Sequence, residues 1–402
     1  MRTPVPFAGC DKLPVEDALE VQERKPAMKK NTNNSKKQIG VRKSVKQGET
    51  KETFAQYIGI DLGDKHCEVC VLDQQGELVK SFRLPMKAAD LERYLATIGR
   101  SRVAIEAGGQ SRWVAEVIER CGHQVFVSNT RKVAYIHQSD AKNDPGDAYK
   151  LAELVYFKPR LLHPIQHRSR EAQADLSWIR GREVLIGART QLVNAVRGMS
   201  KAFGERLAKC STEAFTARLA KQIPEAIRGA VAPLLETIDH LNEQIDYYDR
   251  MEEKIAGERY RKHELLIQVN GVGVHTALSF LLTIGDPKRF EKSRAVGCYV
   301  GLRPKQKDSG ESQPQLGITK AGDEYLRKTL VNCAHYILGP HGKDSDLRRC
   351  GQRICERGGK NAKKRAVIAV ARKLAVLLHR LWVTGEAYEP LRNSQKQGTV
   401  AA

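Results

Sequence analysis

Residues 57–72 read Tyr-Ile-Gly-Ile-Asp-Leu-Gly-Asp-Lys-His-Cys-Glu-Val-Cys-Val-Leu. Tyr, Val and Ile are enriched here, and apolar residues alternate again after the Gly-Asp-Lys turn, so the stretch predicts a hairpin of two strands. Asp61 lies inside the first strand. Burying a carboxylate between Ile60 and Leu62 costs several kcal/mol unless something pairs with it, which makes Asp61 a candidate cation ligand. An aspartate at a strand end that faces water is an equal alternative.

The segments that follow predict an α/β domain with one mixed sheet. A third strand would complete an antiparallel meander, and helices and strands then alternate. Ligands in such sheets gather at strand ends, where Asp61 and Glu106 both lie. We expect strands at residues 78–84, 102–106 and 124–127, and helices at residues 88–98 and 111–120.

Two further acids stand at the start of a predicted helix, in Lys-Asn-Asp-Pro-Gly-Asp at residues 142–147. Pro145 fits just inside a helix start, so Asp144 and Asp147 could serve only as capping residues. Residues three apart at a helix start also share a face, so two carboxylates there could complete a cation site. With Asp61 and Glu106 they would make four acids, enough to hold two magnesium ions about 4 Å apart for phosphodiester chemistry.

Helical patterns dominate from residue 165 onward. A helix is predicted over residues 177–203, and a later segment repeats apolar residues at steps of four and three, which is typical of a coiled-coil seam of about two heptads. The seam fits either a helical hairpin within the chain or a contact between two protomers. Its residues are Leu234, Ile238, Leu241, Ile245 and Tyr248.

Two features of the last third could contact nucleic acid. Gly271 and Gly273 form a turn between two apolar helices. This turn is similar to a helix-hairpin-helix, where free backbone N–H groups can hold a phosphate, although it is also a sound tight turn. A Gly- and Ser-containing loop downstream could approach a phosphodiester, or be only a solvated loop. Its cations are Arg303, Lys305, Lys307 and Lys320.

The charge of the chain indicates a polyanionic partner. Its 68 Lys and Arg residues against 47 Asp and Glu give a net charge of +21 and a pI near 9.6. Nucleic acid is the commonest such partner. A membrane surface is disfavoured because we find no long apolar run, and the N-terminus lacks the apolar core of a signal peptide. Nine scattered cysteines fit reduced thiols in a cytoplasm. Residues 1–53 read as a disordered basic tail or a solvated leader, and residues 391–402 as a polar tail.

Three stretches carry a resemblance to a known family. They are Ile-Glu-Ala-Gly-Gly-Gln-Ser-Arg-Trp from residue 105, Gly-His-Gln-Val-Phe-Val-Ser-Asn from residue 122, and Lys-Asn-Asp-Pro-Gly-Asp-Ala from residue 142. With Asp61 on the first strand, they resemble the RuvC-like branch of the ribonuclease H fold, and more narrowly the DEDD transposases of the IS110 insertion-sequence family.

The resemblance implies a division of the chain and a second site. Residues 54–165 would be a RuvC-like DEDD catalytic domain, residues 166–262 a helical coiled-coil spacer that joins protomers, and residues 263–390 a mainly α C-terminal transposase domain with helix-hairpin-helix character. The family's nucleophilic serine maps onto Ser309, before Gly310. Relatives often have two serines before that glycine. Here the first is Asp308, and Ser312 is a distant reserve.

The resemblance further implies a transposase of an insertion sequence, in the prokaryotic cytoplasm at the nucleoid. Magnesium held by Asp61, Glu106, Asp144 and Asp147 would act with Ser309 to cleave and exchange strands of donor and target DNA through a phosphoserine. An element-encoded noncoding bridge RNA would supply sequence choice, and homodimers would assemble into a homotetramer. A RuvC-like junction endonuclease without serine chemistry, an actin-like sugar kinase or ATPase, and a non-catalytic RNA-binding protein are the alternatives.

Overall fold

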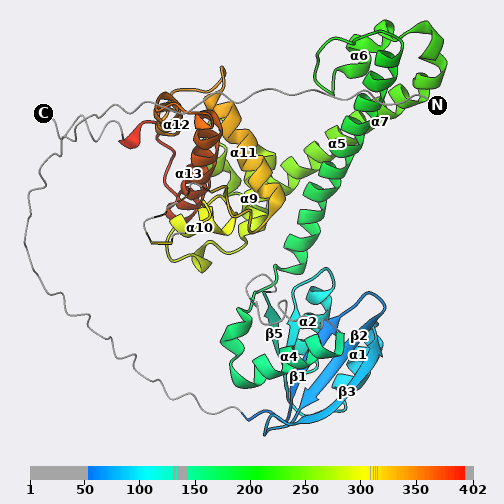
Figure 1. Ribbon diagram of the computed structural model, residues 1–402, viewed down its shortest axis with the longest axis vertical. Coiled ribbons are helices and arrows are strands. Elements are labelled where there is room, and N and C mark those ends of the chain that lie inside the picture. The colour runs from blue at the N-terminus through cyan, green and yellow to red at the C-terminus, as the bar shows by residue number, and fades with distance from the viewer. Residues whose placement is uncertain are drawn as a thin grey trace, which may run out of the picture.

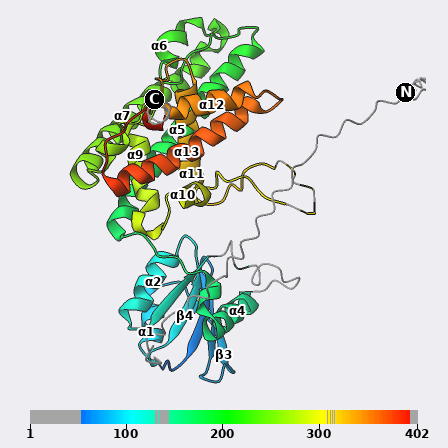
Figure 2. The same cartoon turned by 90° about the vertical axis from the view of Figure 1, so that its left-hand side faces the viewer.

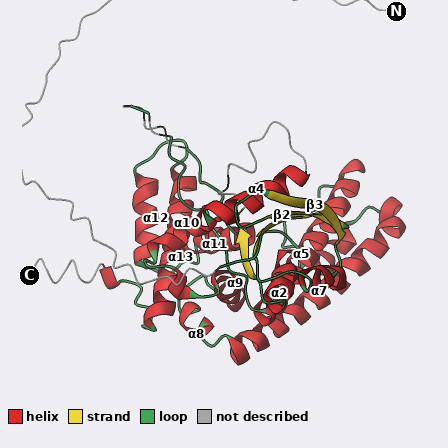
Figure 3. Cartoon of the chain, turned by 90° about the horizontal axis from the view of Figure 1, so that it is seen from below, coloured by secondary structure: helices red, strands yellow, loops and turns green. Residues whose placement is uncertain are grey.

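A computed structural model describes residues 53–129, 133, 144–307, 309, 310, 312, 314 and 316–393, with the side chain of Asp144 outside this description. The predicted basic tail, up to residue 52, and the polar tail from residue 394 therefore lie outside the described residues. Figure 1 shows an α/β unit, a long two-helix arm and a helical C-terminal unit. Figure 3 shows the strands gathered in one part of the molecule while helices make up the rest.

The α/β unit contains a five-stranded mixed sheet in the order β3-β2-β1-β4-β5. Strand β2 is antiparallel to both β1 and β3, whereas β4 is parallel to β1 and to β5. The predicted meander and the single mixed sheet are thus confirmed. The strands are β1 (Tyr57–Leu62), β2 (His66–Leu72), β3 (Leu78–Pro85), β4 (Arg102–Glu106) and β5 (Gln124–Ser128).

Helices cover both faces of this sheet (Figure 2). Side chains alternate along each strand, so Ile58 and Ile60 pack with α1 (Ala88–Leu95) and α2 (Ser111–Arg120) on one face. The other face of the sheet packs against α4 (Asp144–Phe157). The short helix η1 (Pro159–Leu162) then leads to the arm.

Gly59 lets α4 lie unusually close to β1. A Cβ atom at this position would lie 2.0 Å from the carbonyl oxygen of Ala148 and 2.5 Å from the amide nitrogen of Ala152. Two residues earlier on the same face, the ring of Tyr57 packs edge-on against Tyr156, with centroids 4.9 Å apart. These two contacts show that α4 runs antiparallel to β1. The first turn of α4 therefore lies toward the end of β1 that carries Asp61.

The arm consists of α5 (Arg170–Ala202) and α7 (Glu225–Arg259), which pair antiparallel within the chain (Figure 1). The connection between them carries α6 (Phe215–Leu219) and η2 (Ala220–Gln222). Ile238 and Ile245 of the predicted seam are buried. Tyr248 packs against Gly181, where a Cβ would lie 2.7 Å from its ring. Of the two interpretations of this seam, the structure therefore shows the helical hairpin within the chain. An apolar stripe at heptad spacing requires a facing helix, and α5 of the same chain supplies it.

The C-terminal unit is built around α9, α11 and α13, whose apolar residues form its core. No helix among the described residues is both long and apolar enough to cross a membrane. The elements are α8 (His263–Leu266), α9 (Val274–Ile284), η3 (Pro287–Arg289), α10 (Arg294–Tyr299), α11 (Glu324–Leu338), α12 (Asp346–Glu356) and α13 (Ala362–Thr384).

The approach of α4 to Gly59 predicts the effect of a side chain there. We expect Gly59→Val to lower the free energy of unfolding by about 3 kcal/mol, because α4 must move away from the sheet. Urea unfolding followed by circular dichroism, with hydrogen exchange of the α4 amides, would measure this loss.

A glycine in open space provides the matched control. A Cβ at Gly187, within α5, meets nothing within 4 Å. Gly187→Ala should therefore stabilise the arm by about 0.5–1 kcal/mol through helix propensity. An unchanged unfolding curve and unchanged α4 exchange for Gly59→Val would contradict the close approach.

Candidate active site

Asp61 and Glu106 lie side by side at one edge of the sheet. Strands β1 and β4 are parallel, with Ile60 opposite Ile105, so the next residue on each strand is Asp61 and Glu106. Residues in register on parallel strands point to the same face, and Asp61 shares its face with Gly59, which α4 covers. Both acids are half-buried. The sequence prediction that these carboxylates meet at a strand end is consistent with this placement.

The first turn of α4 brings Asp147 to the same end of β1. Asp147 is buried, and its Oδ1 lies 2.9 Å from the Nζ of Lys150. Among the side chains that the structure describes, no three His, Cys, Asp or Glu residues gather closely enough to hold a metal ion. The predicted four-acid set also includes Asp144, whose side chain lies outside the described residues, so its geometry stays a prediction.

Glu68 is a fourth described carboxylate at this edge, and the sequence analysis missed it. It lies on β2 directly across from Asp61, is 8% exposed, and its Oε1 is 2.5 Å from the Nε of Arg83 on β3. Only its place in the alternation of β2 could have pointed to it. Because Arg83 neutralises Glu68, this acid adds little negative charge beside Asp61.

A hairpin-shaped loop between α10 and α11 projects from the C-terminal unit (Figure 2). Ser309 lies near the tip of this hairpin, in an isolated bridge with Ser312. The hairpin spans residues 301–320 and is closed near its tip by backbone hydrogen bonds of 3.1 and 3.0 Å between Ser309 and Ser312. Gly310 has φ +56°, a value that glycine adopts without strain. Ser309 and Gly310 are both exposed. The loop is thus held by isolated antiparallel bridges and presents its serine to solvent.

The cations predicted to contact nucleic acid lie along this hairpin. Backbone hydrogen bonds of 2.9 Å from Thr319 to Arg303 and 2.8 Å from Lys305 to Gly317 hold its two limbs together. Exposed side chains extend from both limbs. They are Arg303, Lys305, Lys307 and Lys320.

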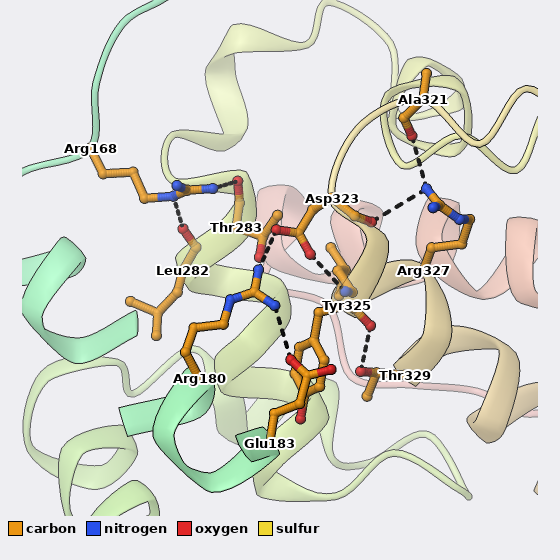
Figure 4. A network of polar contacts seen from close by, with 11 residues as sticks. Arg168, Arg180, Glu183, Leu282, Thr283, Ala321, Asp323, Tyr325, Arg327 and Thr329 are labelled. Carbon is orange, nitrogen blue, oxygen red and sulfur yellow. Dashed lines mark hydrogen bonds and ion pairs between the residues drawn. The ribbon is translucent and has the colours of Figure 1, made fainter. Parts of the chain in front are cut away.

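A buried arginine fixes the base of the hairpin (Figure 4). The Nη1 of Arg327 donates to the carbonyl oxygens of Val300, at 3.2 Å, and Ala321, at 3.1 Å, one on each side of the hairpin. Gly322 has φ +76°, and a Cβ there would lie 1.9 Å from the carbonyl oxygen of Tyr299. The two ends of the hairpin are therefore held together by side-chain and backbone constraints.

The same base is tied to the arm through Asp323, which caps α11 by accepting from the amide of Leu326 at 2.8 Å. Its other oxygen accepts from Arg180 of α5 at 2.6 Å, as Figure 4 shows. The Arg180 guanidinium also lies over the ring of Tyr325, 5.0 Å from its centroid. The orientation of the hairpin base relative to the arm is therefore set by polar contacts.

A buried relay continues from Tyr325 into the arm. Its hydroxyl lies 2.6 Å from Nε2 of His275, and Nδ1 of that ring lies 2.6 Å from Glu252 of α7. Burial, reinforced by Glu183, raises the pKa of Tyr325 to about 12, so its hydroxyl stays protonated in neutral solution. The relay joins α7, α9 and α11 behind the hairpin.

A cleft of about 2720 Å³ is lined by residues of the α/β unit, the arm and the C-terminal unit. Ala107, which follows Glu106, lines one side, and Arg303 with Gly322 at the hairpin base line the other. His167 also lines it, and burial together with Arg112 lowers the pKa of this ring, which keeps it neutral. The cleft is thus lined by a neighbour of Glu106 and by the base of the serine hairpin, but not by Asp61, Glu106, Asp147 or Ser309 themselves.

Gly271 and Gly273 lie in the turn before α9. Gly271 has φ +90° and packs against Tyr336, while Gly273 is exposed and caps α9 with no side-chain hydrogen bond. The preceding helix, α8, has only four residues. The turn has the predicted place in the chain, but its first helix is shorter than the sequence suggested.

Comparison with known proteins matches both parts of the chain. A family profile described as "Transposase" matches residues 58–202, and one described as "Transposase IS116/IS110/IS902 family" matches residues 263–346. The first includes the carboxylate edge of the sheet and α5, and the second includes the serine hairpin.

Individual relatives agree with these profiles. A putative transposase y4pF/y4sB of Sinorhizobium fredii is 31% identical over 293 residues, which cover 71% of this chain and 74% of the relative. The transposase for insertion sequence element IS1111A of Coxiella burnetii is 26% identical over 339 residues, 82% and 90% of the two chains. A pilin gene-inverting protein of Moraxella bovis is 29% identical over 121 residues, 30% and 36%. The chain therefore belongs to the IS110 family of transposases.

Proposed function

We propose that this transposase cleaves and exchanges strands of donor and target DNA through a serine ester of the DNA phosphate. The observation that carries this proposal is the placement of Ser309 at the exposed tip of a hairpin whose base is clamped by buried Arg327. A solvated loop needs no such clamp, whereas a nucleophile must be held in a defined place before it reacts. The cations along the same hairpin would hold the substrate phosphates.

The α/β unit, residues 54–165, would be a RuvC-like domain of the ribonuclease H fold. The strand order β3-β2-β1-β4-β5, in which β2 alone runs opposite to the other four strands, supports this assignment. So does the position of Asp61 on the central strand, with Glu106 beside it and the first turn of α4 at the same end. Residues 166–262 would be the spacer and residues 263–390 the C-terminal transposase domain.

Asp61, Glu106, Asp144 and Asp147 would hold magnesium, in two ions. The two carboxylates on adjacent strands are hard oxygen ligands that suit this metal. Asp147, at the same end of β1, would exchange its contact with Lys150 for the ion. Bound magnesium would polarise the phosphoryl oxygens and stabilise the attacking and leaving oxygens. Glu68 stays paired with Arg83 and would not be a ligand.

The chain's own chemistry begins at Ser309. Its Oγ forms a new bond to the scissile phosphorus while one P–O bond of the DNA backbone breaks, and the departing oxygen leaves as a terminal hydroxyl after taking up a proton. The proton of Ser309 passes to solvent or to a neighbouring base. In the exchange step, a terminal hydroxyl of the other duplex attacks the phosphorus of the serine ester, and the bond to Ser309 breaks. One phosphate ester replaces another, so no external energy source is needed. A weakly acidic hydroxyl needs activation, which the four acids and their metal would supply.

The remaining partners follow from the family. Gly271 and Gly273, in a turn of helix-hairpin-helix character, would offer backbone N–H groups to a phosphate. A structured bridge RNA encoded by the element would select both DNA sites by base pairing, while the protein reads shape and backbone. Recombining two duplexes cuts four strands, so homodimers would assemble into a tetramer at the nucleoid, in the prokaryotic cytoplasm.

Ser309→Ala should abolish the covalent protein–DNA adduct and lower strand transfer by about 1,000-fold or more, because no second hydroxyl replaces the nucleophile. Asp61→Asn should abolish adduct and transfer as well. The measurement incubates purified protein, co-expressed RNA and labelled donor and target DNA with magnesium. Denaturing gels then resolve the adduct.

Ser312→Ala is the matched control across the same turn. Ser312 contributes backbone hydrogen bonds to Ser309, which alanine retains, so this variant should keep the adduct and the transfer rate. If Ser309→Ala still cuts DNA, or if loss of Ser312 removes the adduct instead, the proposed nucleophile is wrong. Cutting without any adduct would favour a RuvC-like nuclease.

Arg327→Gln should loosen the hairpin base, because it leaves buried carbonyl groups without their donor, at a cost of about 2–3 kcal/mol. We expect faster trypsin cleavage after Lys305 and Lys307 and slower strand transfer, with DNA binding retained. The adjacent Lys328 is exposed on the same helix and pairs only distantly with Glu183, at 3.8 Å. Lys328→Gln should change neither rate. Equal cleavage rates in both variants would show that Arg327 does not fix the hairpin.

A further inference from the structure

The corner between α12 and α13 carries a dense group of exposed cations. Between residues 347 and 373 the sequence has Glu356 as its single acid. The basic side chains Arg348 and Arg349 have partners, namely backbone carbonyls and Asp344, respectively. The exposed remainder at the corner, which we call the basic corner, consists of Arg353, Arg357, Lys360, Lys363 and Lys364.

The charge of the basic corner is not compensated by acids of the fold. Three arginines of the arm, by contrast, are held in ion pairs. These are Arg180 with Asp323, Arg182 with Asp249, and Arg259 with Asp175. Within the described part of the chain, no ion pair reaches any of the five side chains of the basic corner. These three arginines hold the arm in place, whereas the five cations of the basic corner are left for an external partner.

The turn between α12 and α13 has a defined conformation. Gly358 and Gly359 have φ +70° and +91°, which lets the chain reverse sharply between the two helices. Arg365 donates to the carbonyl of Gly358 at 3.0 Å, and the amide of Ala362 donates to Gly359 at 3.0 Å. The five cations are therefore carried by two helix ends in a fixed relation.

The charges of the basic corner destabilise the folded chain when no ligand is bound. Lys363 and Lys364 lie in the first turn of α13, which has no acid and no side-chain cap. Positive charges at the positive end of a helix are unfavourable, as are like charges that crowd one another. A polyanion seated on the corner would remove both penalties. The positive end of the helix would then add to the attraction.

The corner projects on the same side of the C-terminal unit as the serine hairpin, away from α7 (Figure 2). A duplex that reaches Ser309 would therefore be able to extend toward it. The stretch from residue 347 to residue 373 contains no Phe, Tyr, Trp or His. Single-stranded nucleic acid is bound largely by stacking on aromatic rings, whereas duplex DNA can be held through its phosphates by Lys and Arg alone.

We propose that the basic corner binds the phosphate backbone of double-stranded DNA beside the strand-exchange site. The proposal rests on the proposed function, because it takes the substrate of the serine hairpin to be DNA. Its role would be sequence-independent. It would hold the flanking duplex while the hairpin acts on one phosphate.

The test compares the removal of five positive charges at each of two places on the full chain. One variant carries R353Q, R357Q, K360Q, K363Q and K364Q. The control carries K201Q, R206Q, K209Q, R218Q and K221Q, which remove the same charge from exposed positions at the far end of the arm. Both are made in the Ser309→Ala background, so that binding is measured without chemistry. Circular dichroism checks that each variant folds.

Binding of a labelled DNA duplex is measured between about 50 and 200 mM salt, where each phosphate contact contributes about 0.9 to the slope of log K against log salt. We expect the corner variant to reduce the slope by about 4 and the control by less than about 1. Equal reductions in both variants would overturn the proposal, since the effect would be that of net charge alone. An unchanged duplex slope with weakened binding of the co-expressed RNA would assign the surface to RNA and also overturn it.

The experiment distinguishes failure of the proposed serine chemistry from failure of the proposed DNA contact at the basic corner. If the parent protein with Ser309 forms no adduct with DNA while the corner variant loses duplex affinity, the serine chemistry is wrong and the basic corner stands. If the adduct forms and the corner variant keeps its slope, only the basic corner is wrong.

Discussion

The direct approach of the α4 backbone to Gly59 is the contact on which the α/β unit depends. With no side chain between them, helix and strand come close enough that Ala148 and Ala152 meet the strand itself. Tyr57 against Tyr156 then sets the direction of the helix. A helix held at two points cannot slide, so its first turn stays at the end of β1. The position of the acids on α4 is therefore a consequence of a glycine two residues before Asp61.

The serine hairpin depends on a different kind of constraint. Its two limbs contain Pro and Gly and bury little surface, so local propensity alone would leave it loose. The order comes from the base, where Arg327 spans both ends and Asp323 joins α11 to Arg180 of the arm. Behind it, the relay from Tyr325 through His275 reaches α7. A change in the angle of the arm would consequently be transmitted to the base of the hairpin and to its serine.

Sequence patterns predicted elements whose signals are local. The strand at residues 102–106 and the helix that follows begin and end where expected, because alternation, a Gly-Gly turn and helical spacing mark them. Features that depend on contacts with residues distant in the sequence were harder to predict from it. The seam of α7 specifies that a helix must face it but not whose helix, and the order of the hairpin comes from a distant arginine. Glu68 is visible as a site neighbour only once the register places it opposite Asp61.

The basic residues behind the net charge of +21 have two roles, because some stabilise the fold and others are exposed to a ligand. Arginines of the arm neutralise acids across helix contacts, and Arg327 and Arg348 satisfy backbone carbonyls. Such side chains hold the fold together and are not available to a ligand. Within the C-terminal unit, exposed cations gather on the hairpin and at the α12–α13 corner, both on one side of the unit (Figure 2). A uniformly basic surface would attract nucleic acid without orienting it. Charge gathered on one side of this unit can favour the direction from which a duplex approaches the serine.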